Sequence, residues 1–248
     1  GLAERATYAA SRPIYGKDRP HEAIIFTNKE QHDPGTLTKA ERSNRTIEVF
    51  KHNHIEVVPT PNYEYKFVTT SHLAVDDLSL TRLDCSSQEF CGTSFKQFLR
   101  VEDGRYDYFA FSYMPETGRR TGIIGQRGMR LVAEDALPLW LRDLDFQSRS
   151  PVRFWLIPSQ KSNRPTPYLP IPAEARITGV DGDSYKVEVL IGEVPDSPGE
   201  SVPPMRLLGT FWMARDRLHV MTRAVMADGR TYQLTSLARV NYWTITGE

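Results

Sequence analysis

The sequence shows no excess of either charge and no apolar run of membrane-spanning length. Its 248 residues include 31 Lys and Arg and 31 Asp and Glu, so the formal net charge is zero. Surfaces that bind nucleic acid usually carry a basic face or a basic excess, so we expect no nucleic-acid partner. No apolar run approaches the roughly 20 residues that a transmembrane helix needs, so we expect no transmembrane segment.

Cysteine is scarce, and familiar catalytic motifs are absent from the sequence. The two cysteines are Cys85 and Cys91. They would lie about 20 Å apart on an extended chain, whereas a tight turn between them would permit a disulfide. Two cysteines do not make a zinc site. The sequence contains neither a Gly-x-Ser-x-Gly elbow nor a His-Glu-x-x-His pair, and we assign no catalytic residue, no cofactor and no metal.

The sequence does contain turn motifs between segments in which apolar and polar residues alternate. Asp-Gly pairs occur at 103–104, 181–182 and 228–229, and Asp-Gly suits the positive φ angles of tight hairpins. They would join 95–101 to 105–114, 175–180 to 184–191 and 218–226 to 230–242. Apolar and polar residues alternate around Tyr65 and Val187, which is typical of half-buried strands. In 105–114 aromatic residues point both ways, which predicts a strand covered on both faces.

Helical pattern is limited to two places, Leu2–Ala10 and a segment from Ala133 to Leu144 that Pro138 must start late or kink. The strand patterns dominate and no convincing interdomain linker is present. We therefore predict a single mainly β domain over residues 1–248. Its expected architecture is a large curved antiparallel sheet, a half barrel or a closed barrel, with one or two helices against it.

Two polar groupings suggest binding chemistry. His52 and His54 would share one face of a strand, as a metal-ligand pair can, or they would form a water-exposed strand end. The segment from Gly118 to Arg130 is rich in glycine and arginine, which suits either anion binding or a solvated basic hairpin. The anion-binding candidates are Arg119, Arg120, Arg127 and Arg130.

The aromatic residues suggest a ligand cavity as well as a core. The sequence contains 11 Tyr, 11 Phe and 4 Trp, and the mouths of curved β-sheets are habitual ligand sites. Polar Gln88 and Glu89 beside an aromatic and a thiol are unusual in a strand, although they could equally tie down a loop. The ligand-binding candidates are Gln88, Glu89, Phe90, Cys91, Tyr106, Tyr108 and Trp212.

Three stretches within residues 15–98, namely Tyr15–Glu30, Glu48–Asn53 and Ser87–Gly92, resemble a poorly characterised family of exported bacterial proteins. That family often carries the label "septum formation inhibitor Maf", although true Maf proteins are α/β nucleotide pyrophosphatases. Its Gln-Glu-Trp-Cys-Gly motif is matched here with Phe90 in place of Trp. The resemblance implies a lipoprotein-carrier-like curved sheet and export to the periplasm, a lipid anchor or the exterior. It transfers no catalytic residue.

We favour a non-enzymatic cell-envelope protein that binds a lipid, another apolar or amphipathic small molecule, or an envelope partner. One alternative is an envelope-acting hydrolase that uses His52 and His54, or Cys91 as nucleophile. The other is a structural or interaction protein. The chain opens with Gly1-Leu2-Ala3 rather than Met, so we expect that a removed export signal precedes it.

Overall fold

The computed structural model describes residues 2–101, 104–115, 117–125, 130–148, 150–164, 166, 168–193 and 204–241. These residues form the strands β1 (Ala3–Ile14), β2 (Lys17–His32), β3 (Ile47–Pro59), β4 (Glu64–Ala74), β5 (Leu80–Glu89), β6 (Gly92–Arg100), β7 (Tyr106–Ser112), β8 (Gly118–Ile124), β9 (Leu131–Ala133), β10 (Val152–Ile157), β11 (Ile171–Asp181), β12 (Ser184–Ile191), β13 (Arg206–Ala214), β14 (Met221–Met226) and β15 (Thr231–Val240). A helical segment of three short turns links β9 to β10, namely η1 (Glu134–Ala136), α1 (Leu137–Trp140) and η2 (Leu141–Asp143).

All fifteen of these strands belong to one sheet, in the order β8-β7-β6-β5-β4-β3-β2-β1-β15-β14-β13-β12-β11-β10-β9. Neighbours are antiparallel except β9 and β10, which are parallel. The end strands β8 and β9 do not pair with each other in the part of the chain described. The structure confirms the mainly β, large antiparallel sheet, and the sheet stays open rather than closing into a barrel.

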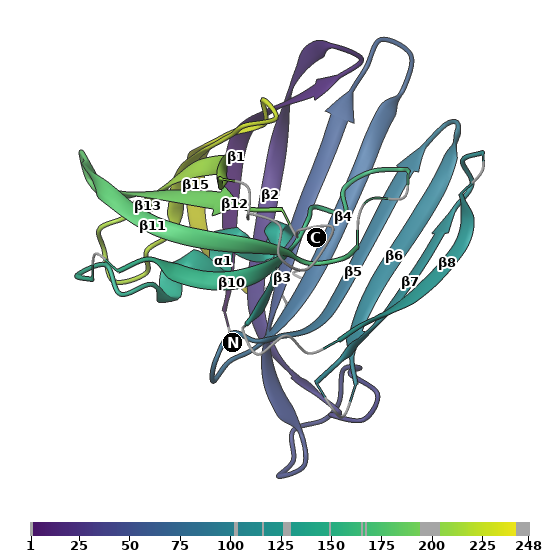
Figure 1. The fold of residues 1–248 in the computed structure, drawn as a ribbon, viewed down its shortest axis with the longest axis horizontal. Coiled ribbons are helices and arrows are strands. Elements are labelled where there is room, and N and C mark those ends of the chain that lie inside the picture. The colour runs from purple at the N-terminus through teal and green to yellow at the C-terminus, as the bar shows by residue number, and fades with distance from the viewer. Residues whose placement is uncertain are drawn as a thin grey trace.

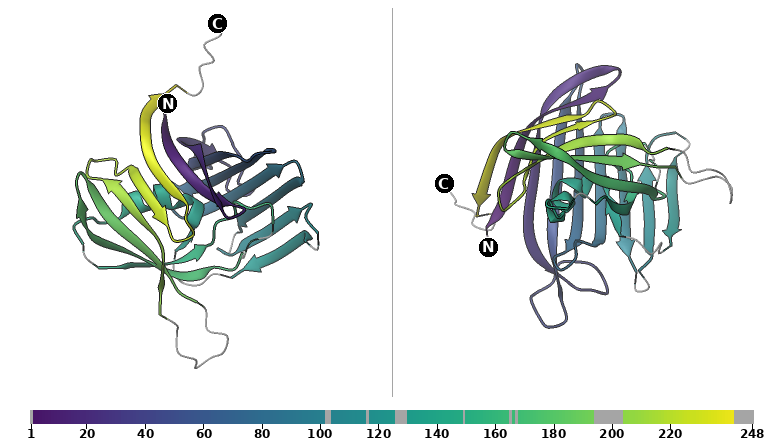
Figure 2. Two further views of the ribbon diagram at one scale, coloured as in Figure 1. Left: turned by 90° about the horizontal axis from the view of Figure 1, so that it is seen from above. Right: turned by 60° about the vertical axis from the view of Figure 1, so that its left-hand side comes forward.

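The sheet bends into two walls that meet where β1 pairs with β15 (Figure 1). The first wall contains β1 to β8 and the second contains β9 to β15. Strands of the second wall run across those of the first, and Figure 2 shows the helical segment lying between the walls. We call the surface that faces this space the inner face of the sheet and the opposite surface the outer face.

The three predicted hairpins are present. β6 pairs with β7, β11 with β12, and β14 with β15, all antiparallel. Gly104, Gly182 and Gly229 have φ angles of 77°, 57° and 91° at the turns, a region that glycine enters without steric cost. Asp103 lies outside the described residues.

The predicted helix at Leu2–Ala10 is wrong, because these residues form most of β1. Ala6, Tyr8 and Ala10 are buried, while Arg5 and Ala9 on the opposite face are exposed. Alanine favours helix in isolation, but here its small side chain lets a central strand lie in the packed angle between two walls. Tertiary packing therefore overrides the local preference.

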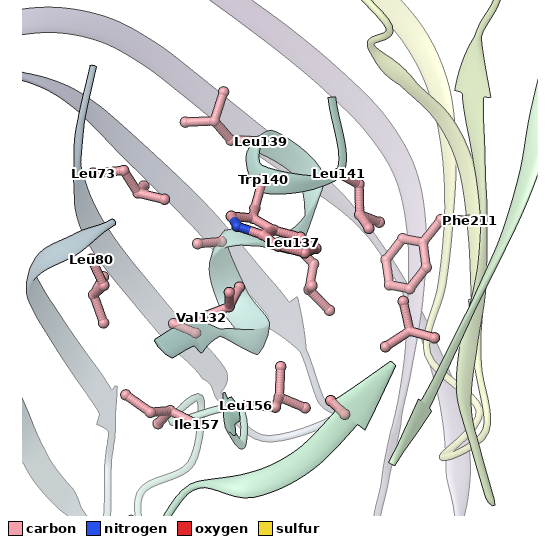
Figure 3. Close-up of a cluster of buried hydrophobic side chains, with 14 of the residues drawn as sticks. Leu73, Leu80, Val132, Leu137, Leu139, Trp140, Leu141, Leu156, Ile157 and Phe211 are labelled. Carbon is pink, nitrogen blue, oxygen red and sulfur yellow. The ribbon is translucent and has the colours of Figure 1, made fainter. Parts of the chain in front are cut away.

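The core lies between the walls and around the helical segment, as Figure 3 shows. Leu137, Trp140 and Leu141 are buried there, with Leu80 from the first wall and Phe211 from the second. Pro138 occupies the first turn of α1, where its missing N–H costs no hydrogen bond. The predicted helix from Ala133 to Leu144 is thus confirmed as a short, broken helical segment.

The prediction that residues 105–114 are covered on both faces is wrong for the outer face. Tyr106 and Tyr108 are buried on the inner face of β7, but Phe111 and Tyr113 are 48% and 71% exposed. The structure places the helical segment only on the inner side of this wall. The outer aromatic residues therefore face solvent.

Candidate ligand-binding site

A row of polar side chains on β3 points into the space between the walls. His52, His54 and Glu56 are all buried on the inner face, while Lys51 and Asn53 alternate with them on the other face. The two histidines do share one face, as predicted, but the water-exposed alternative is wrong. His52 Nδ1 lies 2.9 Å from the Thr27 hydroxyl.

Glu56 is fully buried and is the centre of a polar cluster. Lys161 Nζ donates a 2.7 Å hydrogen bond to its Oε1, and the Tyr232 hydroxyl donates to the same oxygen at 2.8 Å. Arg12 Nε lies 3.1 Å from its Oε2. Burial alone would raise the pKa of this carboxyl group, but Lys161 and Arg12 outweigh burial and hold the Glu56 pKa well below its usual range. Glu56 is therefore ionised.

Two histidines complete the surroundings of this carboxylate. His54 Nε2 lies 3.1 Å from Glu56 Oε1 and His21 Nε2 lies 3.5 Å from Oε2. Burial, followed by the positive charge of Lys161, lowers the pKa of His54. His54 is therefore a neutral neighbour of the ion pair, and the cationic partners of Glu56 are Arg12 and Lys161.

Lys161 comes from a stretch of chain, residues 159–163, that crosses the inner face of the first wall. We call it the crossing segment. Side chains of the sheet donate to its backbone carbonyl oxygens: Lys96 to Gln160 and Ser162 at 2.8 Å each, Cys85 to Gln160 at 3.2 Å, Ser94 to Ser162 at 3.0 Å, Ser112 to Asn163 at 2.7 Å and Arg12 to Lys161 at 3.1 Å. The polar residues of this face thus hold the protein's own chain.

A pocket of about 440 Å³ opens beside the crossing segment, within the size range of small-molecule sites. Its charged lining residues are the cationic Arg12, Lys161 and Arg230, with Asp228 as an acidic neighbour. Its aromatic and apolar lining is formed by Pro13, Ile14, Tyr15, Tyr65 and Phe67. The pocket therefore presents charge and apolar surface together.

Contacts among the lining residues hold the pocket in shape. The Arg12 guanidinium lies 4.6 Å from the centre of the Phe67 ring, and Tyr65 stacks on Phe67. The Tyr15 and Tyr65 hydroxyl groups are 2.5 Å apart. The aromatic side of the pocket is thus ordered before any ligand arrives, which lowers the entropic cost of binding.

Arg230 reaches the pocket from the second wall. Its Nη2 donates to Glu134 at 2.6 Å and its Nε donates to Asp228 at 2.7 Å. Burial would lower its pKa, but Glu134 and Asp228 keep the pKa well above its usual value. Both walls therefore contribute a permanent positive charge to the pocket.

Four of the predicted ligand-binding residues lie at the tip of the β5–β6 hairpin, close to the pocket but not in its lining. Phe90 is 84% exposed and stacks on Tyr63, which in turn packs against Tyr65. Glu89 accepts a hydrogen bond from Asn163 of the crossing segment. This contact fits the alternative interpretation, in which Glu89 fixes a loop in place rather than binding a ligand. Gln88 and Cys91 are exposed.

The other three predicted ligand-binding residues are elsewhere. Tyr106 and Tyr108 are buried in the core, where Tyr108 stacks on Tyr168. Trp212 lies on β13 and donates to Asp181 at 2.9 Å. The structure does not bring these residues to the pocket.

The arginine candidates do not converge on one anion site among the described residues. Arg119 and Arg120 are exposed on the end strand β8, and Arg130 lies 3.7 Å from Asp143. Arg127 lies outside the described residues. These positions fit the second interpretation, a solvated basic hairpin, better than they fit an anion-binding site.

Both cysteines are free thiols. Burial raises the pKa of Cys85 to about 12, so its sulfur is protonated and donates to the crossing segment. Cys91 is exposed at the hairpin tip. Cys85 and Cys91 therefore do not form a disulfide.

Sequence reasoning missed most of the pocket. The lining residues Arg12, Lys161 and Arg230, and Glu56 behind them, are far apart in the chain, and only the fold brings them together. One local signal was available, since Glu56 continues the period-two row of His52 and His54. A third polar residue on what should be a buried strand face indicates an internal polar cluster.

Only one group of described residues has the spacing of a metal site. Glu30, His32 and His72 each offer a ligand atom within 4.8 Å of the others. This group lies on the outer face, and neither His52 nor His54 belongs to it.

No protein-family model matches the sequence, and the searches of curated proteins and of solved structures found no match. Among the residues the structure describes, no helix has both the length and the apolar character required to span a bilayer. The fold and the pocket therefore define the class here, an open single-sheet β protein with an amphipathic pocket where its two walls face each other.

Proposed function

We propose that the protein is a non-catalytic carrier that binds an amphipathic small molecule with an anionic head. The observation that supports this is the pocket, where Arg12, Lys161 and Arg230 lie beside Tyr15, Tyr65 and Phe67. The anionic head would meet the guanidinium and ammonium groups, and the apolar part would lie on the aromatic side.

The buried acids favour this assignment rather than oppose it. Glu56 and Glu134 contact the cations from behind but do not line the pocket. They fix the positions of the cationic groups, so little side-chain entropy is lost when an anion binds. The side chains of Arg12 and Arg230 are each 10% exposed and that of Lys161 is 1% exposed, so the ligand would meet mainly the two guanidinium groups, with Asp228 as the acid in the lining.

The hydrolase alternative has less support. His54 and Glu56 are within hydrogen-bond distance of each other, but neither lines the pocket. The interior space that His54 does line is only about 20 Å³, the size of a single water molecule. A substrate in the pocket would therefore meet Lys161 and Arg12 rather than an acid–base pair.

We also propose that the protein acts in the cell envelope. The support is the resemblance of 15–98 to an exported family, together with a carrier-type pocket. Cell fractionation tests this directly, and recovery of the protein with cytoplasmic markers would contradict it.

The carrier proposal is tested by native mass spectrometry of the purified protein, followed by solvent extraction. We expect a stoichiometric bound molecule with an acidic head. Tyr15→Asn and Arg12→Met should both lose it, and Tyr15→Asn is the milder change because Asn tolerates the φ of 54° found there.

Arg5→Met is the matched control. Arg5 lies on the same strand as Arg12 but is exposed on the outer face, so the bound molecule should be retained. A clean unliganded mass with no binding of fatty acids or phospholipids in titration, or equal retention by Tyr15→Asn, would contradict the proposal.

A further inference from the structure

A second polar cluster lies on the outer face of the first wall, away from the pocket. Glu30 and His32 alternate along β2, and His72 comes from β4. His32 Nε2 lies 2.9 Å from Glu30 Oε1, and His72 Nε2 lies 3.4 Å from the same oxygen. The two imidazole rings are 4.5 Å apart.

These three side chains are buried although they lie on the outer face. Their exposures are 9% for Glu30, 2% for His32 and 6% for His72. The chain between β2 and β3 covers them: Leu37 is 4% exposed, and its carbonyl oxygen accepts a 3.2 Å hydrogen bond from Arg82, which pairs with His72 across β4 and β5. The same excursion extends at the lower end of β2 and β3 in Figure 1.

Both rings turn Nε2 towards one carboxylate oxygen, and their other nitrogens are unconstrained. Within the described structure, Nδ1 of His32 and Nδ1 of His72 are buried without a hydrogen-bond partner. In metal sites and catalytic sites, the partner of one ring nitrogen decides which nitrogen carries the proton. In the arrangement described, the Glu30 carboxylate accepts the Nε2–H of His32. Because Nδ1 has no partner, the proton can move to Nδ1 and leave the Nε2 lone pair for a metal ion.

We propose that Glu30, His32 and His72 bind one divalent transition-metal ion of the zinc class. Imidazole nitrogen and carboxylate oxygen are zinc ligands at about 2.0–2.2 Å, and ligand atoms within 4.8 Å of one another can share such an ion. Three protein ligands leave one tetrahedral position for water. The ion would join the end of β2 to β4 across β3.

Lys51 is a cationic group that would repel a metal ion bound at this site. Its Nζ lies 3.8 Å from Glu30 Oε2, so it supplies positive charge to the same carboxylate. Its side chain is 28% exposed, and it can withdraw to solvent when a metal ion binds. Removal of this charge should therefore tighten metal binding.

The test is zinc stoichiometry of chelator-treated, tag-free protein after dialysis against zinc chloride, measured by inductively coupled plasma mass spectrometry. We expect one zinc ion per chain for the wild type. His72→Gln and Glu30→Gln should weaken binding by at least about tenfold, since even outer partners of metal ligands cost 10- to 100-fold. Cobalt should give visible absorption bands with the wild type, and weaker bands at the same cobalt concentration with His72→Gln and Glu30→Gln.

His219→Asn is the control for general loss of a histidine. His219 lies between β13 and β14 with a φ of 47° that Asn tolerates, and this variant should keep one zinc ion. Circular dichroism checks that each variant is folded.

Lys51→Met tests the site without removal of a ligand and should bind zinc several-fold more tightly. No zinc on the wild type, equal zinc on a folded His72→Gln, or unchanged affinity of Lys51→Met would each overturn the proposal.

Discussion

Glu56 shows how a buried charge is maintained in this protein. Its carboxylate is completely removed from water and is stabilised by Lys161, Arg12 and Tyr232. Removal of one partner from a buried ion pair leaves the remaining charge uncompensated, which costs more than the pair contributes.

Glu56→Gln should therefore lower the free energy of unfolding by about 3–5 kcal/mol. Urea denaturation followed by circular dichroism measures it. Glu48→Gln on the same strand is the control, because Glu48 is 33% exposed in its ion pairs and such pairs contribute less than about 1 kcal/mol. Equal losses for both variants would contradict the role assigned to Glu56.

Lys96 gives a prediction of pH dependence. Burial lowers its pKa from 10.5 to about 8, so between these values the unfolded chain binds more protons than the folded protein. Stability then rises with pH in that window. Denaturation at pH 8, 9 and 10 should show wild-type stability rising relative to Lys96→Met, and parallel curves for the two proteins would contradict the assignment.

At the scale of elements, the hairpins could be predicted from the sequence, whereas the central strand β1 could not. Asp181-Gly182 and the alternation after it carry their own structural signal, because the turn and the strand period are local properties. β1 carries a misleading signal, since Ala6, Ala9 and Ala10 favour helix. Only the packing of two walls explains why small residues are needed there.

The position of β1 gives a paired test by substitution. Ala6→Leu should destabilise the protein by roughly 1–3 kcal/mol, since it adds volume to a fully packed site. Ala9→Leu should have little effect, because Ala9 is exposed on the opposite face. Thermal unfolding of the two variants measures the difference, and equal effects would not fit a strand with alternating burial.

The candidate site residues show the same contrast between local signals in the sequence and contacts that depend on the whole fold. The His52 and His54 pair was visible in the sequence because its members are close in the chain. Glu56 could have been added from strand period alone. Lys161 and Arg230 could not, because their approach to Glu56 and Glu134 depends on the order of fifteen strands.

At the scale of the whole molecule, the two walls share one core. Its buried residues come from both walls and from the helical segment between them. The single domain expected from the sequence stays a prediction, which cooperative unfolding can test. Trp140, Trp155 and Trp212 report on the helical segment and the second wall, whereas far-ultraviolet circular dichroism reports on all strands.

We expect the urea transitions measured by tryptophan fluorescence and by circular dichroism to coincide, as they do for a single cooperative unit. Separate midpoints would mean that the walls unfold independently and that the single-domain prediction is wrong.

The pairing of β1 with β15 has a consequence for synthesis. β1 leaves the ribosome long before its partner β15, so the first wall can assemble hairpin by hairpin while one edge of β1 stays open. Contacts of such long sequence separation form slowly. During translation that edge is a row of unpaired backbone groups exposed to other chains, and a chaperone that covers it until β15 emerges would prevent aggregation through this edge.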